Sequence, residues 1–192
     1  AYQIPDRNDR KKIGIGIIRG NSLQGYGVDF GAQDWIKLFS KIAYELQKRG
    51  YEYEFFTNGL PADTVLGRKI LKKLKLPSEY LVTRPVDDGP LVDTINGYQG
   101  IITCRMHSSI AAFTMGVPSV ILSWNDKVEK LMQIIGYPDR AIKQDQFDAV
   151  YVVDKLEQSL AEGIADEKLQ KMKDLATESV TDYLPLIIEC KK

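Results

Sequence analysis

Residues 100–123 read GIITCRMHSSIAAFTMGVPSVILS, and this stretch decides the fold. Two continuous apolar runs, residues 101–104 and 119–123, are typical of strands that are covered on both faces. Between them lies an apolar segment of helical length, residues 108–115, which leads into a Gly-Val-Pro turn. A strand, a helix and a second strand in this order predict a right-handed crossover between two parallel strands.

The rest of the chain repeats this alternation. Further strands are predicted over residues 13–18, 53–57, 81–83 and 150–153. Helices are predicted over residues 35–46, 61–75, 128–135, 155–161 and 166 to about 183, with a short one from residue 91. The pattern indicates an α/β fold, a doubly wound and mostly parallel sheet with helices on both faces, which is Rossmann-like. We expect residues 1–10 to form a polar leader or linker, and residues 11–192 to form a single domain.

The balance of charge argues against two classes of main partner. Lysine plus arginine and aspartate plus glutamate both number 26, so the bulk electrostatic attraction to nucleic acid or to an anionic membrane is absent. A local basic pocket stays compatible with this balance. No run approaches the roughly 18 apolar residues of a membrane span, and the polar start lacks the apolar core of a signal peptide. We therefore expect a cytoplasmic protein.

Cysteines and acidic residues give no metal signature. Cys104 and Cys190 have no metal-type spacing and suit a reducing cytosol. Asp87, Asp88 and Asp126 stand in sequences typical of turns. We expect no metal site.

The most informative polar residues stand where the strand over residues 101–104 gives way to a helix. Ligands of open parallel sheets bind beyond the carboxyl ends of the strands, near the point where the strand order reverses. Arg105 suits bidentate contact with phosphate or carboxylate, and His107 is the only histidine of the chain. Ser108 and Ser109 open the helix, whose free N–H groups and dipole favour an anion. The pattern predicts a small-anion site.

Three further residues follow neighbouring strands. Arg19 could be a second anion ligand, Lys127 could meet an anionic substrate, and Trp124 could form a flat wall for a sugar or a base. Each has a structural alternative, because Arg19 and Lys127 could be exposed surface residues and Trp124 a core residue. Arg105 and His107 could likewise cap carbonyls or pair with a carboxylate. The apolar sequence around Arg105 and His107 favours function, since a partly desolvated charge needs a partner.

These residues also carry a family resemblance. Arg105, His107, the Gly116 and Pro118 turn, Trp124 and Lys127 form a pattern that resembles the C-terminal part of the polysaccharide pyruvyl transferase family. The stretch FFTNGLPAD at residues 55–63 and the opening IGIGIIR at residues 13–19 are similar to that family as well. Trp124 stands where the family commonly has tyrosine, and Met106 where it commonly has leucine.

The resemblance implies a function and a larger architecture. It implies transfer of a pyruvyl group from phosphoenolpyruvate to sugar hydroxyls of a cell-surface glycan or exopolysaccharide precursor, with Arg105 and His107 holding the donor. It implies a fold like the two-domain GT-B glycosyltransferases, of which this chain would be the C-terminal, donor-binding half. The expected partners are phosphoenolpyruvate, a glycan or lipid-linked sugar acceptor and an N-terminal domain of the same protein. Phosphoenolpyruvate is a substrate here, so no cofactor is expected.

Two other functions stay open on the sequence. The same residues would suit a GT-B-type nucleotide-sugar glycosyltransferase or sugar epimerase, in which Arg105 and His107 grip a diphosphate. They would also suit a non-catalytic, anion-binding half. The chain alone need not be active, because an enzyme with its site in a crevice needs both walls. For a lipid-linked acceptor, the inner face of the membrane is an alternative place of work to the bulk cytoplasm.

Overall fold

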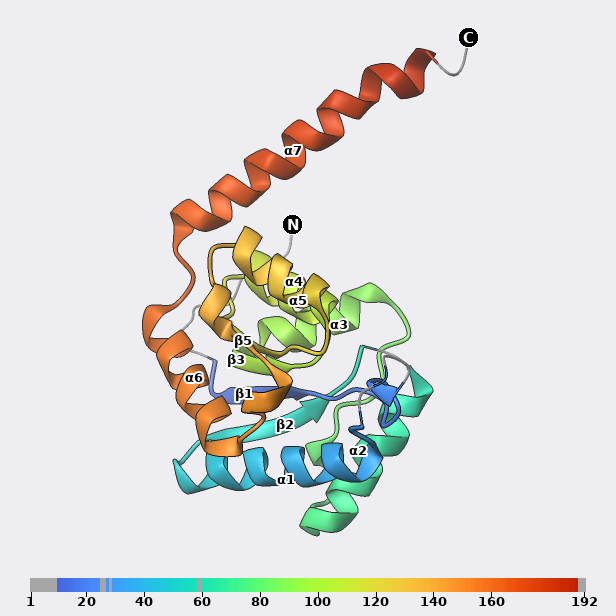
Figure 1. The fold of residues 1–192 in the computed structure, drawn as a ribbon, viewed down its shortest axis with the longest axis vertical. Coiled ribbons are helices and arrows are strands. Elements are labelled where there is room, and N and C mark those ends of the chain that lie inside the picture. The colour runs from blue at the N-terminus through green and yellow to red at the C-terminus, as the bar shows by residue number, and fades with distance from the viewer. Residues whose placement is uncertain (1–9, 25–26, 28, 59, 190–192) are drawn as a thin grey trace.

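The computed structural model describes residues 10–24, 27, 29–58 and 60–189. Its centre is a sheet of five parallel strands in the order β2-β1-β3-β4-β5 (Figure 1). The strands are β1 Lys12–Gly16, β2 Glu52–Phe56, β3 Tyr98–Thr103, β4 Ser119–Leu122 and β5 Ala141–Ile142. The predicted α/β fold with a parallel, Rossmann-like sheet is confirmed.

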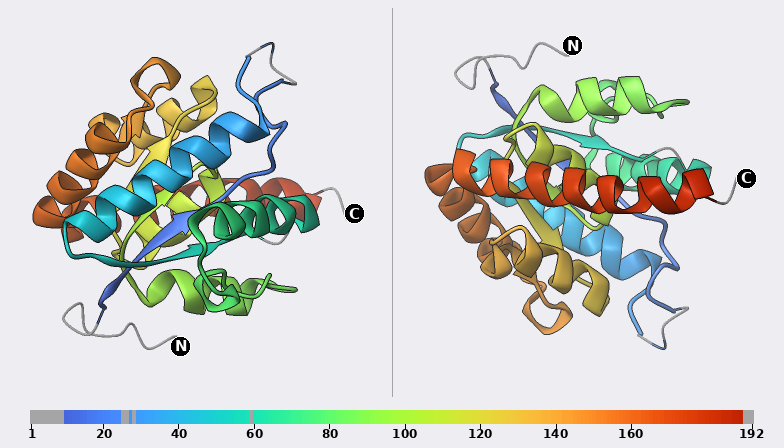
Figure 2. Two further views of the ribbon diagram at one scale, coloured as in Figure 1. Left: turned by 90° about the horizontal axis from the view of Figure 1, so that it is seen from below. Right: turned by 90° about the horizontal axis from the view of Figure 1, so that it is seen from above.

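Helices cover both faces of the sheet (Figure 2). The described helices are α1 Ala32–Lys48, α2 Pro61–Leu74, α3 Asp88–Asn96, α4 Met106–Thr114, α5 Asp126–Ile134, α6 Ala149–Glu162 and α7 Asp166–Glu189. One face packs against α1, α2 and α6 in the largest apolar cluster. The other face packs against α3, α4 and α5 in two smaller clusters. The sheet is therefore buried on both sides, which explains the unbroken apolar strands.

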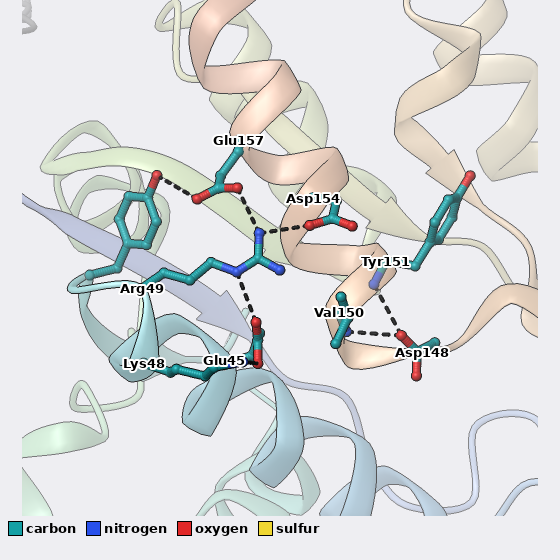
Figure 3. Close-up of polar contacts among 9 residues, drawn as sticks. Glu45, Lys48, Arg49, Asp148, Val150, Tyr151, Asp154 and Glu157 are labelled. Carbon is teal, nitrogen blue, oxygen red and sulfur yellow. Dashed lines mark hydrogen bonds and ion pairs between the residues drawn. The ribbon is translucent and has the colours of Figure 1, made fainter.

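Helix α1 shows how the sequence pattern produces packing. Trp35, Phe39, Ile42 and Leu46 recur at helical spacing and are all fully buried. At the end of the helix, Arg49 binds Glu45 through Nε at 2.9 Å. Its Nη1 also reaches Asp154 at 2.7 Å and Glu157 at 2.6 Å, both on α6 (Figure 3). This ion network joins the two helices that cover the same face of the sheet.

One strand prediction is wrong. Residues 150–153 lie in α6, and the fifth strand is the two-residue β5. The carboxylate of Asp148 caps α6 by accepting hydrogen bonds from the N–H groups of Val150 and Tyr151 at 3.0 and 3.1 Å (Figure 3). Val152, Val153 and Leu156 are then fully buried at helical spacing. The cap and this burial outweigh the strand preference of the Val-Tyr-Val-Val run.

Other boundaries differ as well, and β3 begins at Tyr98, three residues before its predicted start. The strand predicted over residues 81–83 is a single bridge between Leu81 and Phe55. Helix α7 continues to Glu189 rather than ending near Pro185, and it projects away from the sheet (Figure 1). Its first turns pack through Leu169 and Met172, whereas residues 173–181 are exposed. None of the helices in the described part of the chain is long and apolar enough to cross a membrane.

Candidate functional site

The strand order places a switch point between β1 and β3. The chain leaves β1 toward β2 on one side and leaves β3 toward β4 on the other, so a crevice is expected beyond the carboxyl ends of this pair. Arg19 follows β1, and Arg105 follows β3 directly before α4. The sheet therefore brings the predicted anion-binding residues to one edge.

Arg105 is held in place at this edge by a buried carboxylate. Its Nη2 donates to Oδ2 of Asp63 in a short ion pair, and its backbone N–H donates to Oγ1 of Thr103 at 3.1 Å. Asp63 lies in the first turn of α2 and is completely buried, whereas the Arg105 side chain is 20% exposed. Oδ2 of Asp63 also accepts the hydroxyl of Thr57 at 3.0 Å. The guanidinium is thereby fixed in orientation and partly presented to solvent.

The structural alternative for Arg105 is therefore realised in part, since it does pair with a carboxylate. Polar atoms around this pair remain without partners. Arg105 Nε, Asp63 Oδ1 and Ser109 Oγ are buried and have no hydrogen-bond partner among the described residues. Buried polar atoms without a partner are costly and uncommon in folded proteins. At the start of α4, Arg105 Nε and Ser109 Oγ therefore retain the capacity to donate a hydrogen bond to a ligand.

Helix α4 supplies the second part of the site. It begins at Met106 with Arg105 at the N-cap position, so His107 stands in its first turn and is exposed. The first N–H groups of a helix have no partner within it and attract anions. Ser108 and Ser109 are fully buried, and the Ser108 hydroxyl donates to the side chain of Asn58 after β2. Ser108 therefore anchors the helix start, Ser109 is buried without a partner for its hydroxyl, and the His107 side chain is exposed.

The remaining predicted residues lie at the ends of neighbouring strands. Trp124 follows β4, is half-buried, and donates from Nε1 to the carbonyl of Cys104 at 2.9 Å. It thus ties the end of β4 to the residue before Arg105. Lys127, in the first turn of α5, and Arg19 are both exposed. They flank the edge without an ion pair to any described residue.

Cys104 lies directly behind the site. It is completely buried, and burial raises the pKa of its thiol well above the usual value. The nearby Arg105 guanidinium opposes this rise and the Asp63 carboxylate adds to it. A buried neutral thiol is a poor nucleophile, so Cys104 is a packing residue.

Asp63, Thr57 and Asn58 were absent from the residues predicted for the site. All three belong to the stretch FFTNGLPAD, which carried the family resemblance but had no assigned role. Asp63 follows Pro61 in the first helical turn, where an acidic residue is common for helix stability alone. Only the fold reveals that its carboxylate faces Arg105.

No metal site accompanies these residues. Within the described ranges, no group of three or more histidine, cysteine, aspartate or glutamate side chains could hold a metal ion. Two hollows are not lined by Arg105 or His107. One, of about 380 Å³, includes Lys12, Tyr53 and Tyr80. The other, of about 500 Å³, lies between α2 and residues 78–84.

A comparison with protein families agrees with the resemblance predicted from the sequence. The family described as polysaccharide pyruvyl transferase matches residues 32–126, a range that includes Asp63, Arg105, His107 and Trp124. The solved structure of the glycosyltransferase SnogD from Streptomyces nogalater is similar with a TM-score of 0.36 and 16% sequence identity. The alignment covers 90% of this chain and 45% of that one, so the chain spans less than half of its length. No curated protein sequence matches the chain.

Proposed function

We propose that this chain, which belongs to the polysaccharide pyruvyl transferase family over residues 32–126, binds phosphoenolpyruvate at the carboxyl end of β3 and passes its pyruvyl group to sugar hydroxyls. The observation that carries the proposal is the guanidinium of Arg105, fixed by buried Asp63 at the start of α4. This pair lies at the switch point of the sheet and inside the matched range. Modification of a polysaccharide is the reaction class that the family supports.

Phosphoenolpyruvate suits the charges at this edge. It carries a phosphate and a carboxylate, and a guanidinium can bind either in bidentate fashion. Asp63 neutralises part of the Arg105 charge, so attraction of the whole ligand also needs other cations. Arg19 and Lys127 are exposed at the ends of β1 and β4 and can supply this attraction. The free N–H groups of α4 can bind a phosphate oxygen.

The reaction can be balanced with these groups. A proton adds to C3 of phosphoenolpyruvate, and C2 acquires positive character that the first sugar hydroxyl attacks as it loses its proton. The bond between C2 and the phosphate oxygen then breaks, and phosphate leaves with the electron pair. A second hydroxyl of the sugar adds to C2 and loses its proton, which closes the ketal. Two hydroxyl protons are released, one replaces the proton taken up at C3, and phosphate carries the other.

His107 is the side chain suited to proton transfer in this scheme. It is exposed on the first turn of α4, next to the arginine that would hold the donor. General acid catalysis typically contributes about 10² to 10⁴-fold. A glutamine at position 107 can hydrogen-bond to a phosphate but cannot deliver a proton. His107→Gln is expected to keep binding phosphoenolpyruvate and to lose turnover, whereas loss of binding would assign His107 to holding the phosphate.

We also propose that a further domain of the same protein completes the site. His107, Arg19 and Lys127 are exposed, so the described residues leave the reaction open to water. A second wall would exclude water and orient a glycan or lipid-linked acceptor. In this proposal the protein acts in the cytoplasm, at the inner face of the membrane when the acceptor is lipid-linked.

The test is a transfer assay with the full-length protein. Phosphate release from phosphoenolpyruvate is measured against a panel of glycan precursors, and the ketal methyl group is identified by NMR. Arg105→Ala and His107→Ala are expected to abolish release while keeping the fold, and Lys37→Ala on the outer side of α1 serves as a control. Unchanged turnover in either site variant contradicts the proposal. So does stabilisation by uridine or guanosine diphosphate with none by phosphoenolpyruvate, which indicates a glycosyltransferase.

A further inference from the structure

Helix α2 carries a dense row of basic residues that the proposed reaction does not use. We call this row the basic face, and it consists of four residues on the helix and one directly after it, namely Arg68, Lys69, Lys72, Lys73 and Lys75. All five side chains are exposed. Figure 1 shows α2 at the end of the molecule opposite the tip of α7. Within the described part of the chain, the basic face is therefore open to a binding partner.

The charges of the basic face are not balanced locally. Elsewhere Lys12, Arg49 and Arg140 each contact a carboxylate within 4.0 Å. None of the five residues of the basic face has such a contact with a described residue. Residues 60–76, which include α2, contain five basic residues and one acidic residue, a net charge of +4 in a chain whose net charge is zero. The acidic residue is Asp63, which is buried against Arg105.

Exposed apolar side chains stand beside these charges. Val65 lies one turn before Lys69 on α2 and is 52% exposed. Leu60, directly before the helix, is 41% exposed. The groove of about 500 Å³ along α2 is lined by Val65, Leu71, Leu81 and Val82 together with Arg68 and Arg84. Apolar and basic side chains thus alternate over one surface.

The combination of basic and apolar side chains distinguishes between two classes of polyanionic partner, nucleic acids and anionic bilayers. A nucleic acid would satisfy the charges but would leave the exposed Val65 and Leu60 without an apolar partner. An anionic bilayer satisfies both, because lysines and arginines bind the head groups while apolar side chains enter the acyl boundary. We propose that the basic face of α2, with Leu60 and Val65, docks on an anionic lipid bilayer.

Docking by α2 would have a consequence for the site. The first turn of the same helix holds Asp63, the partner of Arg105. A bilayer bound along α2 would therefore lie beside the carboxyl edge of the sheet. A lipid-linked sugar could then reach this edge without leaving the membrane. This consequence rests on the proposed function, whereas the docking itself does not.

The test measures binding to vesicles and no enzymatic activity. The purified full-length protein is sedimented with phosphatidylcholine vesicles that contain either no phosphatidylglycerol or roughly 30% of it. Binding is expected only to the anionic vesicles and is expected to weaken at high salt. The triple variant Lys69→Gln, Lys72→Gln and Lys73→Gln is expected to bind at least about tenfold more weakly. Leu60→Gln with Val65→Gln is expected to weaken the binding that remains at high salt.

A matched control separates this surface from general charge. Lys37→Gln, Lys41→Gln and Lys171→Gln remove the same charge from exposed positions on α1 and α7, and this variant is expected to bind like the wild type. An equal loss in both triple variants contradicts the proposal. It is overturned equally by an absence of wild-type binding to anionic vesicles, or by heparin binding without vesicle binding. Phosphoenolpyruvate binding in the same samples reports on the proposed function separately.

Discussion

Asp63 is the residue on which the geometry of the edge depends. Its buried carboxylate accepts hydrogen bonds from Arg105 and from the hydroxyl of Thr57. Asp63→Ala removes Oδ2, the acceptor of both hydrogen bonds, and leaves a partly buried guanidinium without its partner. We expect the free energy of unfolding to fall by about 1 to 3 kcal/mol. Urea denaturation measures this change.

A control and a conservative variant separate the ion pair from packing. Asp139→Ala removes an exposed carboxylate and is expected to change stability by at most about 0.5 kcal/mol. Asp63→Asn keeps the size and one acceptor oxygen, so its loss of stability should be smaller than that of Asp63→Ala. Equal stability of the wild type and Asp63→Ala would show that the ion pair does not stabilise the fold.

The buried thiol of Cys104 makes stability depend on alkaline pH. Its pKa is raised in the folded protein, so the thiol stays neutral there, while in the unfolded chain it ionises above about pH 8.5. The unfolded state therefore binds fewer protons, and stability falls as the pH rises above that value, by up to about 1.4 kcal/mol per pH unit from this group. In a Cys190→Ser background, Cys104→Ala should lose this part of the pH dependence. An identical slope just above about pH 8.5, where cysteine ionises before tyrosine and lysine, contradicts the assignment.

At the scale of elements, helix α6 contains residues for which the sequence predicted a strand, and its N-terminal cap can be tested by substitution. The Asp148 carboxylate caps the helix through two backbone N–H groups. Asp148→Ala is expected to lower the free energy of unfolding by about 1 kcal/mol. Asp145→Ala, three residues earlier and exposed, is the control and should have little effect. If both variants lose the same stability in thermal unfolding, the cap does not hold the start of α6.

The elements that the sequence predicted well are those with a strong period. The buried stripe of α1 and the apolar runs of β3 and β4 are readable because every position repeats the same environment. β5 could not be predicted, since two residues carry no period. The prediction for residues 150–153 was wrong because it rested on the strand preference of β-branched residues. In the fold, the N-terminal cap and burial at helical spacing outweigh this preference.

At the scale of the whole molecule, the site was predictable only where it is local in sequence. Arg105 and His107 stand two residues apart, and their position after a strand was sufficient to place them at the edge. Asp63 is 42 residues from Arg105, and no pattern in the sequence relates them. The overall charge balance likewise gives no indication of the basic face of α2, because a net charge of zero is a sum over the molecule and does not say where the charges lie. Long-range pairing and the distribution of charge need the fold.

The central claim is that phosphoenolpyruvate binds at the carboxyl end of β3, and calorimetric titration of the protein tests it most directly. The wild type is expected to bind phosphoenolpyruvate, and Arg105→Ala to bind roughly 10 to 150-fold more weakly, as loss of a charge-assisted hydrogen bond predicts. Arg105→Lys keeps the charge without the planar fork, so it should bind with intermediate affinity even if Arg105→Ala folds poorly. Equal affinity in the wild type and both variants, or no binding by the wild type, would contradict the account.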